Sequence, residues 1–406
     1  MSHKILVVED SRAFRNYLFN QLSQLGYEVI CAESLAETQA ILSQDHRFFC
    51  TVLDYCLPDA QDGEVIDLVL STKQKVVVLT ATFNEKVRER CIAKGVLDYI
   101  LKDSMSSVSY LIPMMKRLLN NQNHHALVVD DSQTVRRYVS QLLEHQYIRT
   151  TTAVDGLDAL KKLQQHKDIS IIITDHDMPH QDGIEMIREI RQSISKNELA
   201  ILGVSSSDDK TMTARFLKAG ANDFLNKPFN QEEFYCRVHQ LLDIKEANTE
   251  LFRLANQDAL TGLWNRRYFF NQRQEHQADN CHVAMMDIDH FKKVNDTWGH
   301  DGGDKVLTSI AHILNLYFSD SIVARFGGEE FCIQFCGEFA QFIQRLENLR
   351  QRIEKTSISF LDSSIRVTIS IGVAQSDTGD INQLLTLADS RLYLAKNRGR
   401  NQLISD

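Results

Sequence analysis

The sequence KILVVEDS at residues 4–11 returns as HALVVDDS at residues 125–132. Two spacings are also the same in both copies. Asp10–Asp54 and Asp131–Asp175 are each 44 residues apart (54 − 10 and 175 − 131). Thr80–Lys102 and Ser205–Lys227 are each 22 residues apart (102 − 80 and 227 − 205). Such self-similarity indicates a duplicated unit of about 120 residues, which is a normal domain size.

Each copy alternates short apolar runs with stretches of helical periodicity. The runs are ILVV, FFCTVLD and KVVVLT in the first copy, and ALVV, ISIIITD and LAILGVS in the second. Strands that alternate with helices favour an α/β fold, a doubly wound parallel sheet with helices on both faces. Because the carboxyl ends of such strands form the ligand crevice, we expect the polar residues at these ends to converge.

Three carboxylates gather at that edge in each copy. The two sets are Glu9, Asp10 and Asp54, and Asp130, Asp131 and Asp175. Like charges this close need a cation, and an all-oxygen site that keeps waters suits Mg²⁺. A simpler interpretation, acids that only cap the following helices, explains one acid at a time but not two matched sets.

Both copies resemble response regulator receiver domains. The resemblance implies that Asp54 and Asp175 accept a phosphoryl group from an upstream histidine kinase or phosphotransfer protein, with Mg²⁺ held by the paired acids. It also implies the switch residues, which are the hydroxyls of Thr80 and Ser205, the lysines Lys102 and Lys227, and the aromatics Tyr99 and Phe224. A metal and an ammonium would stabilise charge on the transferring phosphoryl group while the carboxylate attacks.

The first copy departs from the receiver pattern at two points. Its glycine after the phosphorylated aspartate, Gly63, falls one position later than Gly183 does in the second copy. Asp103 stands where the second copy has Pro228. Both copies retain all five functional positions, which are the two paired acids, the phosphorylated aspartate, the hydroxyl residue and the lysine. We therefore expect both copies to be phosphorylated.

Composition limits the partners and the compartment. The net charge of −9 argues against non-specific binding to nucleic acid or anionic lipid. No apolar run approaches the ~20 residues that span a bilayer. The eight cysteines include no CxxC pair and fit neither a zinc site nor a disulfide framework. We expect a cytoplasmic protein with free thiols that binds neither nucleic acid nor membrane.

Residues 230–257 contain no proline or glycine, and their apolar residues recur at spacings of three and four. The stripe consists of Phe234, Val238, Leu241, Ile244, Ala247, Leu251 and Leu254. Two interpretations stay open. The segment is either the last receiver helix plus a short linker, or a signalling helix of roughly 40 Å that pairs with a second copy in a dimer.

Residues 325–335 read RFGGEEFCIQF, which predicts a hairpin with its glycine pair at the turn. Alone, the two glutamates would be solvated charges at its tip. Residues 283–288 predict a buried strand that reaches Asp287 near its end. If this strand neighbours the hairpin, Asp287, Glu329 and Glu330 surround a pair of metal ions suited to phosphoryl or nucleotidyl transfer. The glycines then let a ligand approach the backbone.

Further polar residues suit a nucleotide. Lys292, Asn295 and Asp304 follow the acidic strand, and an Asp carboxylate can accept from the N1 and N2 donors of guanine. Lys396 and Arg400 are predicted four apart on one helix face, set to hold phosphates. A solvated helix end favoured by the helix dipole is the alternative for these two residues.

Residues 255–406 resemble the GGDEF family of diguanylate cyclases. The matching segments DIDHFKKVND, GHDGGD, GGEEF, VTISIGVA and AKNRGRN occur in family order. The resemblance implies a palm-like α/β fold that condenses two GTP into cyclic di-GMP and pyrophosphate. It also implies Mg²⁺ or Mn²⁺ as cofactor and a homodimer, because each domain forms only a half-site.

The resemblance also implies roles for individual residues. Asp287, the Ile288 carbonyl, Glu329 and Glu330 correspond to the metal site, with Glu329 and Glu330 as catalytic residues and Glu329 as base for the 3′-hydroxyl. Asn295 and Asp304 correspond to guanine recognition, Lys292, Lys396 and Arg400 to phosphate contacts, and Gly327 and Gly328 to the surface under GTP. The RxxD product-inhibition motif is replaced by FSDS at residues 318–321, so we expect weak or absent feedback inhibition.

The expected organisation is a receiver at residues 1–122, a second receiver at 123–243, a helical connector at 230–257 and a cyclase domain at 255–406. A phosphorylation-regulated diguanylate cyclase accounts for all of these parts. The alternatives are a non-catalytic GTP-binding adaptor and a phosphate sink. Neither accounts for a complete set of cyclase residues.

Overall fold

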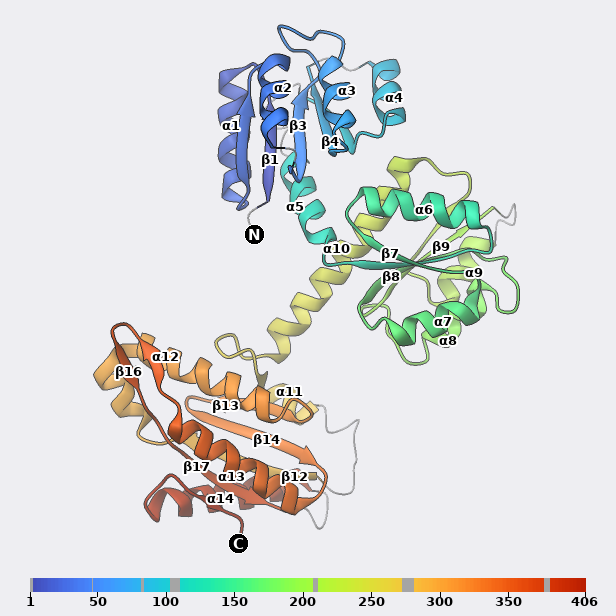
Figure 1. Cartoon of the computed structure of the whole chain (residues 1–406). Helices are drawn as coiled ribbons and strands as arrows, with labels where there is room; N and C mark the ends of the chain where they lie inside the picture. The colour runs from blue at the N-terminus through green and yellow to red at the C-terminus, as the bar shows by residue number, and fades with distance from the viewer. Residues whose placement is uncertain are drawn as a thin grey trace. The chain divides into compact units, whose positions relative to one another are not determined.

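The structure is a computed structural model that describes residues 3–45, 47–81, 84–102, 110–206, 211–271, 281–375 and 380–406. The chain divides into two compact units, residues 1–247 and 248–406. The first unit contains two similar sheets with their helices, and the second contains a third sheet (Figure 1).

The first sheet is parallel, with strand order β2-β1-β3-β4-β5. Its strands are β1 (Lys4–Val8), β2 (Glu28–Ala32), β3 (Cys50–Asp54), β4 (Val76–Thr80) and β5 (Asp98–Leu101). Its helices are α1 (Arg12–Gln24), α2 (Leu35–Gln44), α3 (Glu64–Ser71), α4 (Glu85–Ala93) and α5 (Leu111–Asn121).

The second sheet repeats this order as β10-β9-β8-β6-β7, again with parallel strands. Its strands are β6 (His125–Val129), β7 (Arg149–Ala153), β8 (Ile169–Thr174), β9 (Ala200–Ser205) and β10 (Asp223–Asn226). Its first helices are α6 (Gln133–His145), α7 (Gly156–Gln165), α8 (Gly183–Ile190) and α9 (Met212–Ala219). The matching topology confirms the duplication and the α/β fold class.

Each of these sheets has a hydrophobic core on both faces. Every residue of β3, β4, β8 and β9 is buried, which is why these strands are continuous apolar runs. In the second sheet α6 covers one face, and α7 and α8 cover the other (Figure 1). The predicted acids lie at the carboxyl ends of β1, β3, β6 and β8 or directly after them.

The connector is one continuous helix, α10 (Gln231–Asn256). Phe234, Val238 and Leu242 in its first half are buried in the core of the second receiver. Further along, Leu251 is 63% exposed and Leu254 is 60% exposed. The helix therefore begins as the last helix of the second receiver and then continues with an exposed apolar stripe.

The third sheet is mixed, with order β11-β13-β14-β12-β17-β18. Its strands are β11 (Trp264–Asn265), β12 (Cys281–Ile288), β13 (Ile322–Gly327), β14 (Glu330–Cys336), β17 (Ile369–Ala374) and β18 (Leu403–Ile404), and β15 (Ile358–Phe360) pairs separately with β16 (Ser363–Ile365). The helices are α11 (Arg266–Asn271), α12 (Phe291–Tyr317), α13 (Phe339–Lys355) and α14 (Ile381–Asn397). Helices α12 and α13 cover one face and α14 the other, so the palm-like expectation for this α/β domain agrees with the structure.

One expectation about cysteines is wrong. Cys336 is disulfide-bonded, and the β12–β14 register places its Cα opposite that of Cys281. Six other cysteines are free, as expected. Among the helices of the described ranges, none is long and apolar enough to cross a membrane.

Candidate functional sites

The predicted acids of the first receiver meet at the carboxyl ends of β1 and β3. The ligating oxygens of Glu9, Asp10 and Asp54 all lie within 4.8 Å of one another. Lys102 follows β5, and its Nζ lies 2.8 Å from Glu9 Oε2 and 2.5 Å from Asp54 Oδ2. Glu9 and Asp54 are buried and Asp10 is exposed, so the cluster opens to solvent on one side.

The second receiver repeats this arrangement. Asp130, Asp131 and Asp175 also have ligating oxygens within 4.8 Å of one another. Lys227 Nζ lies 2.8 Å from Asp130 Oδ2 and 3.0 Å from Asp175 Oδ2. The structure therefore brings together every metal and lysine residue that the sequence predicted for both receivers.

Burial controls the electrostatics of these clusters. It raises the pKa values of the Glu9 and Asp175 carboxyl groups, although the neighbouring lysines oppose this effect. Burial by itself lowers the pKa of Lys102, but hydrogen bonds to Asp54 and Glu9 outweigh it and raise that pKa. Each cluster thus holds concentrated negative charge and open oxygen ligands, a donor set that fits Mg²⁺.

The predicted switch residues adjoin these clusters. Backbone hydrogen bonds pair Lys102 N with Thr80 O at 2.6 Å and Lys227 N with Ser205 O at 2.8 Å. Tyr99 and Phe224 are both buried. Burial raises the pKa of the Tyr99 hydroxyl, and a hydrogen bond with Thr80 partly opposes this shift. In the second receiver Phe224 packs on Phe216 with ring centroids 5.1 Å apart. Asp103 lies outside the described residues.

The third domain places the predicted glycine pair at a hairpin tip between β13 and β14. Gly327 (φ 152°) and Gly328 (φ 50°) both adopt positive φ, as expected. Gly327 pairs with Glu330, so Gly328 and Glu329 form the turn itself. Arg325 donates to Gly328 O at 3.0 and 2.7 Å and contacts Asp258 Oδ1 at 2.9 Å, which ties the tip to the start of the domain.

Asp287 on β12 lies beside this tip. It is paired with Glu330 in the β12–β14 register, and the neighbouring Ile288 N–H donates to Glu329 O at 3.3 Å. Burial raises the pKa of Asp287 to about 6; Lys396 opposes this shift, and the charges of Glu329 and Glu330 reinforce it. These three carboxylates are not drawn together as tightly as the receiver trios, because they do not form a described cluster within 4.8 Å.

Lys396, predicted to contact phosphate, has its Nζ 2.7 Å from Asp287 Oδ2. Arg400 corrects an expectation, because it does not share a helix face with Lys396. Helix α14 ends at Asn397, and Gly399 and Arg400 adopt φ values of 112° and 65°. The chain turns there, since Arg400 N–H donates to Ala395 O at 3.0 Å.

A kink in α12 sets Asn295 against Gly303, the residue before Asp304. The helix breaks at Gly299 (φ 69°, ψ 177°), between Asn295 and Asp304. A Cβ at Gly303 would lie 2.0 Å from Asn295 Oδ1, so the Asn295 amide lies directly against that glycine. Lys292 lies in the first turn of the same helix. A side chain at position 303 would therefore displace Asn295, one of the two residues predicted to recognise guanine. The sequence analysis did not identify this requirement for glycine.

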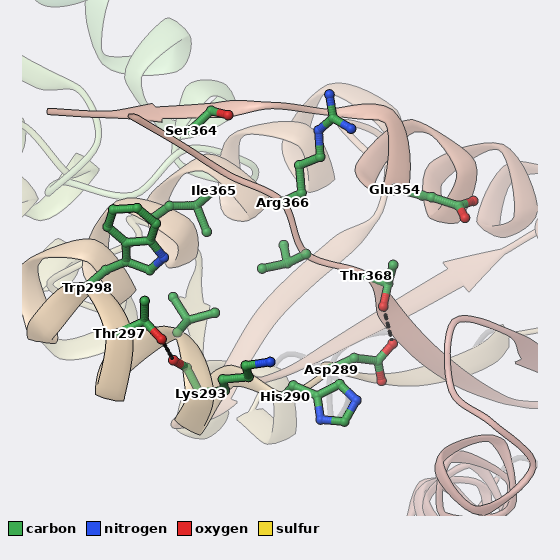
Figure 2. Close-up of a pocket in the computed structure, with 12 residues that line it drawn as sticks. Asp289, His290, Lys293, Thr297, Trp298, Glu354, Ser364, Ile365, Arg366 and Thr368 are labelled. Atoms are coloured by element: carbon green, nitrogen blue, oxygen red, sulfur yellow. Dashed lines mark hydrogen bonds between the residues drawn. The ribbon is translucent and has the colours of Figure 1, made fainter. Parts of the chain in front are cut away.

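Asp289 does not join the metal residues. Its carboxylate accepts from Thr368 Oγ1 and Ser370 Oγ, both at 2.7 Å, and from Asn401 N at 3.0 Å. Figure 2 shows the Thr368 contact at the edge of a pocket of about 460 Å³. Trp298 and Arg366 also line this pocket, but none of the predicted site residues does.

The segment that replaces the RxxD motif is occupied by internal contacts. Phe318 is fully buried, and Arg345 contacts Asp320 through two nitrogens at 2.7 and 2.9 Å. The Arg345 guanidinium also lies 4.5 Å from the centroid of the Phe318 ring. The hydrogen bond from Arg345 lowers the pKa of Asp320 to about 2. Both groups are therefore engaged with each other.

Comparisons with known proteins agree with this architecture. The family model "Response regulator receiver domain" matches residues 5–109 and 126–239, and "Diguanylate cyclase, GGDEF domain" matches residues 255–402. The chain is 26% identical to "Response regulator PleD" of Caulobacter vibrioides, over all of this chain and 99% of that protein.

Two further relatives match parts of the chain. "Probable diguanylate cyclase DgcT" of Escherichia coli is 37% identical over 42% of this chain and 39% of its own length. A crystal structure of a "putative two-component system response regulator/ggdef domain protein" is 39% identical with a TM-score of 0.55, covering 60% of this chain and 100% of that chain.

The receiver geometry predicts a metal-dependent stability defect. Replacing Lys102 with alanine leaves Glu9 and Asp54 buried without their cation. In the presence of a chelator, the free energy of unfolding of this variant should therefore be about 3 kcal/mol lower than that of the wild type. Mg²⁺ should restore part of this loss, because it binds only the folded cluster. Denaturant unfolding with and without Mg²⁺ measures both effects. Lys94→Ala, which removes an exposed pair with Asp67, is the matched control. A loss of stability in Lys102→Ala that is the same with and without Mg²⁺ would contradict a metal site at this cluster.

Proposed function

The chain belongs to the response regulator receiver family and carries a GGDEF diguanylate cyclase domain, and we propose that it condenses two GTP into cyclic di-GMP and two pyrophosphates under control of receiver phosphorylation. The proposal rests chiefly on Asp287 lying opposite Glu330 beside a glycine turn that presents Glu329. In this arrangement the carboxylates lie near the backbone of Gly327 and Gly328, which carries no side chains.

The carboxylates of the cyclase domain fit Mg²⁺ or Mn²⁺. The raised pKa of Asp287 reflects burial and the adjacent negative charges, and a divalent cation would relieve both. Asp287, the Ile288 carbonyl, Glu329 and Glu330 would hold the ions. When bound, they would supply charge stabilisation for the attacking 3′-hydroxyl and the leaving pyrophosphate. Glu329, at the turn, would accept the 3′-hydroxyl proton.

Two groups of residues would bind the nucleotide. Asn295 and Asp304, on the two segments of the kinked α12, would recognise the guanine edge. Lys292, Lys396 and Arg400 would contact the phosphates. Lys396 is paired with Asp287, and with nucleotide bound it would contact a phosphate oxygen. The Gly327–Gly328 backbone would support the substrate.

Each domain would supply one GTP, so the reaction requires two cyclase domains face to face. The exposed stripe of α10, including Leu251 and Leu254, supports pairing of the connector in a homodimer. Phosphorylation of Asp54 and Asp175 by a histidine kinase or phosphotransfer protein would promote this dimer and raise the effective concentration of the second half-site. We propose Mg²⁺ as cofactor at both receiver clusters.

We propose the domain limits 1–122, 123–243 and 255–406, with 230–257 as connector, and a cytoplasmic location. The non-catalytic adaptor is disfavoured, because the chain retains the glutamates that catalysis needs together with Asn295 and the basic residues. The phosphate sink is disfavoured because it needs none of these residues.

Glu329→Gln should lower the rate of cyclic di-GMP formation by at least about 100-fold, because the glutamine cannot accept the 3′-hydroxyl proton. Purified protein incubated with GTP and Mg²⁺, followed by chromatographic product identification, measures the rate. Glu338→Gln, at an exposed position beyond β14, is the control and should keep full activity. Equal rates for Glu329→Gln and the wild type would exclude Glu329 as the base.

Both receivers should accept phosphate. Asp54→Asn and Asp175→Asn should each lose part of the label transferred from a phosphodonor, and the double variant should lose all of it. Autoradiography of the four proteins after phosphotransfer measures this. Label that persists undiminished in the double variant would overturn the assignment.

Feedback inhibition through the RxxD position should be weak or absent. The motif is replaced by FSDS, and Asp320 is already paired with Arg345. Activity measured with added cyclic di-GMP, after removal of copurified product, should show no inhibition from this site. Tight cyclic di-GMP binding that is abolished by Asp320→Ala would show the opposite.

A further inference from the structure

A cluster of two histidines and one aspartate lies at the edge of the second receiver opposite its phosphorylation site. His125 is the first residue of β6, His166 follows α7, and Asp168 precedes β8. One ligating atom from each side chain lies within 4.8 Å of the others. His125 Nδ1 and Asp168 Oδ2 are 3.1 Å apart, a separation expected for neighbouring ligands of one small cation.

We propose that His125, His166 and Asp168 bind a divalent transition metal ion, Zn²⁺ or one of similar chemistry, with water as the fourth ligand. Two imidazole nitrogens and one carboxylate form a donor set typical of open tetrahedral zinc sites. This set differs in kind from the all-oxygen clusters at the other edge of both receivers, which suit Mg²⁺. Neither the proposed cyclase reaction nor phosphorylation uses these residues.

The cluster is pre-organised around His125. Its side chain is buried, and its Nε2 lies 2.8 Å from Thr151 Oγ1. Such a hydrogen bond from outside the metal shell orients the ring and leaves the other nitrogen for the metal. Burial also lowers the pKa of His125, which keeps the imidazole neutral and able to bind a metal.

The first receiver shows that the fold does not require these residues. The positions 121 residues earlier (125 − 4, 166 − 45 and 168 − 47) hold Lys4, Asp45 and Arg47. There Lys4 Nζ lies 2.8 Å from Asp45 Oδ2, and Arg47 Nε lies 3.4 Å from Asp45 Oδ1. At this position the first receiver therefore has ion pairs, whereas the second receiver has three side chains that can bind a metal ion.

Arg149 is the group that the metal must displace. Its Nη2 contacts Asp168 Oδ2 and lies 3.2 Å from His125 Nδ1. The Arg149 side chain is 65% exposed, so it can turn into solvent, and exposed ion pairs of this kind contribute little stability. The arginine thus competes with the metal for the same two atoms.

Titration of the full-length protein with Co²⁺ in excess Mg²⁺ tests the proposal, because Mg²⁺ occupies the oxygen clusters and Co²⁺ reports nitrogen ligands by its visible absorption. The wild type should bind one Co²⁺ with an imidazole-type spectrum, and Zn²⁺ should displace it. His166→Ala and Asp168→Asn should weaken binding by at least about 10-fold. Arg149→Ala should strengthen it, because the competitor is removed. Asp45→Ala, at the corresponding corner of the first receiver, should change nothing.

Both ligand variants alter residues outside the core, and thermal unfolding without added metal verifies that they are folded. Wild-type protein that gives no nitrogen-ligated Co²⁺ spectrum overturns the proposal. So does Co²⁺ affinity that is the same in His166→Ala, Asp168→Asn and the wild type. An unchanged affinity in Arg149→Ala contradicts the competition between arginine and metal.

Discussion

Negative charge concentrated at the ends of buried strands is the constraint on which the rest of this structure depends. In each of the three domains, an ammonium group offsets part of it. Lys102 contacts Glu9 and Asp54, Lys227 contacts Asp130 and Asp175, and Lys396 contacts Asp287. One positive charge cannot neutralise two or three carboxylates, so each site retains a deficit that a divalent cation can fill. The lysine and a bound metal would together stabilise charge on a phosphoryl group.

The folds create this charge density by different routes. In the receivers, parallel strands end at one edge, so acids from β1 and β3 or from β6 and β8 meet there. In the cyclase domain, antiparallel pairing of β12 with β14 sets Asp287 opposite Glu330, and the turn that follows Gly327 carries the half-buried Glu329. There the carboxylates lie near the bare backbone of Gly327 and Gly328, which a phosphate could approach.

The sequence predicted what depends on local pattern and spacing. The buried strands were recognisable because both faces are covered, and the repeat identified both acid clusters and their lysines. Edge strands such as β7, with sequence RTTTA, were not specified because half-exposed strands lack an apolar run. Arg400 was misplaced because a positive φ at Gly399 ends α14 early. The contact of Asn295 with Gly303 arises only from the kink in α12, which the sequence pattern does not reveal.

We propose that receiver phosphorylation brings two cyclase half-sites together. The most direct test measures the specific rate of cyclic di-GMP formation over a range of protein concentrations, with and without a phosphoryl-group mimic such as beryllofluoride. The specific rate should rise with concentration for the unmodified protein, and with the mimic it should be higher and depend less on concentration. A specific rate that is independent of both concentration and mimic would contradict it.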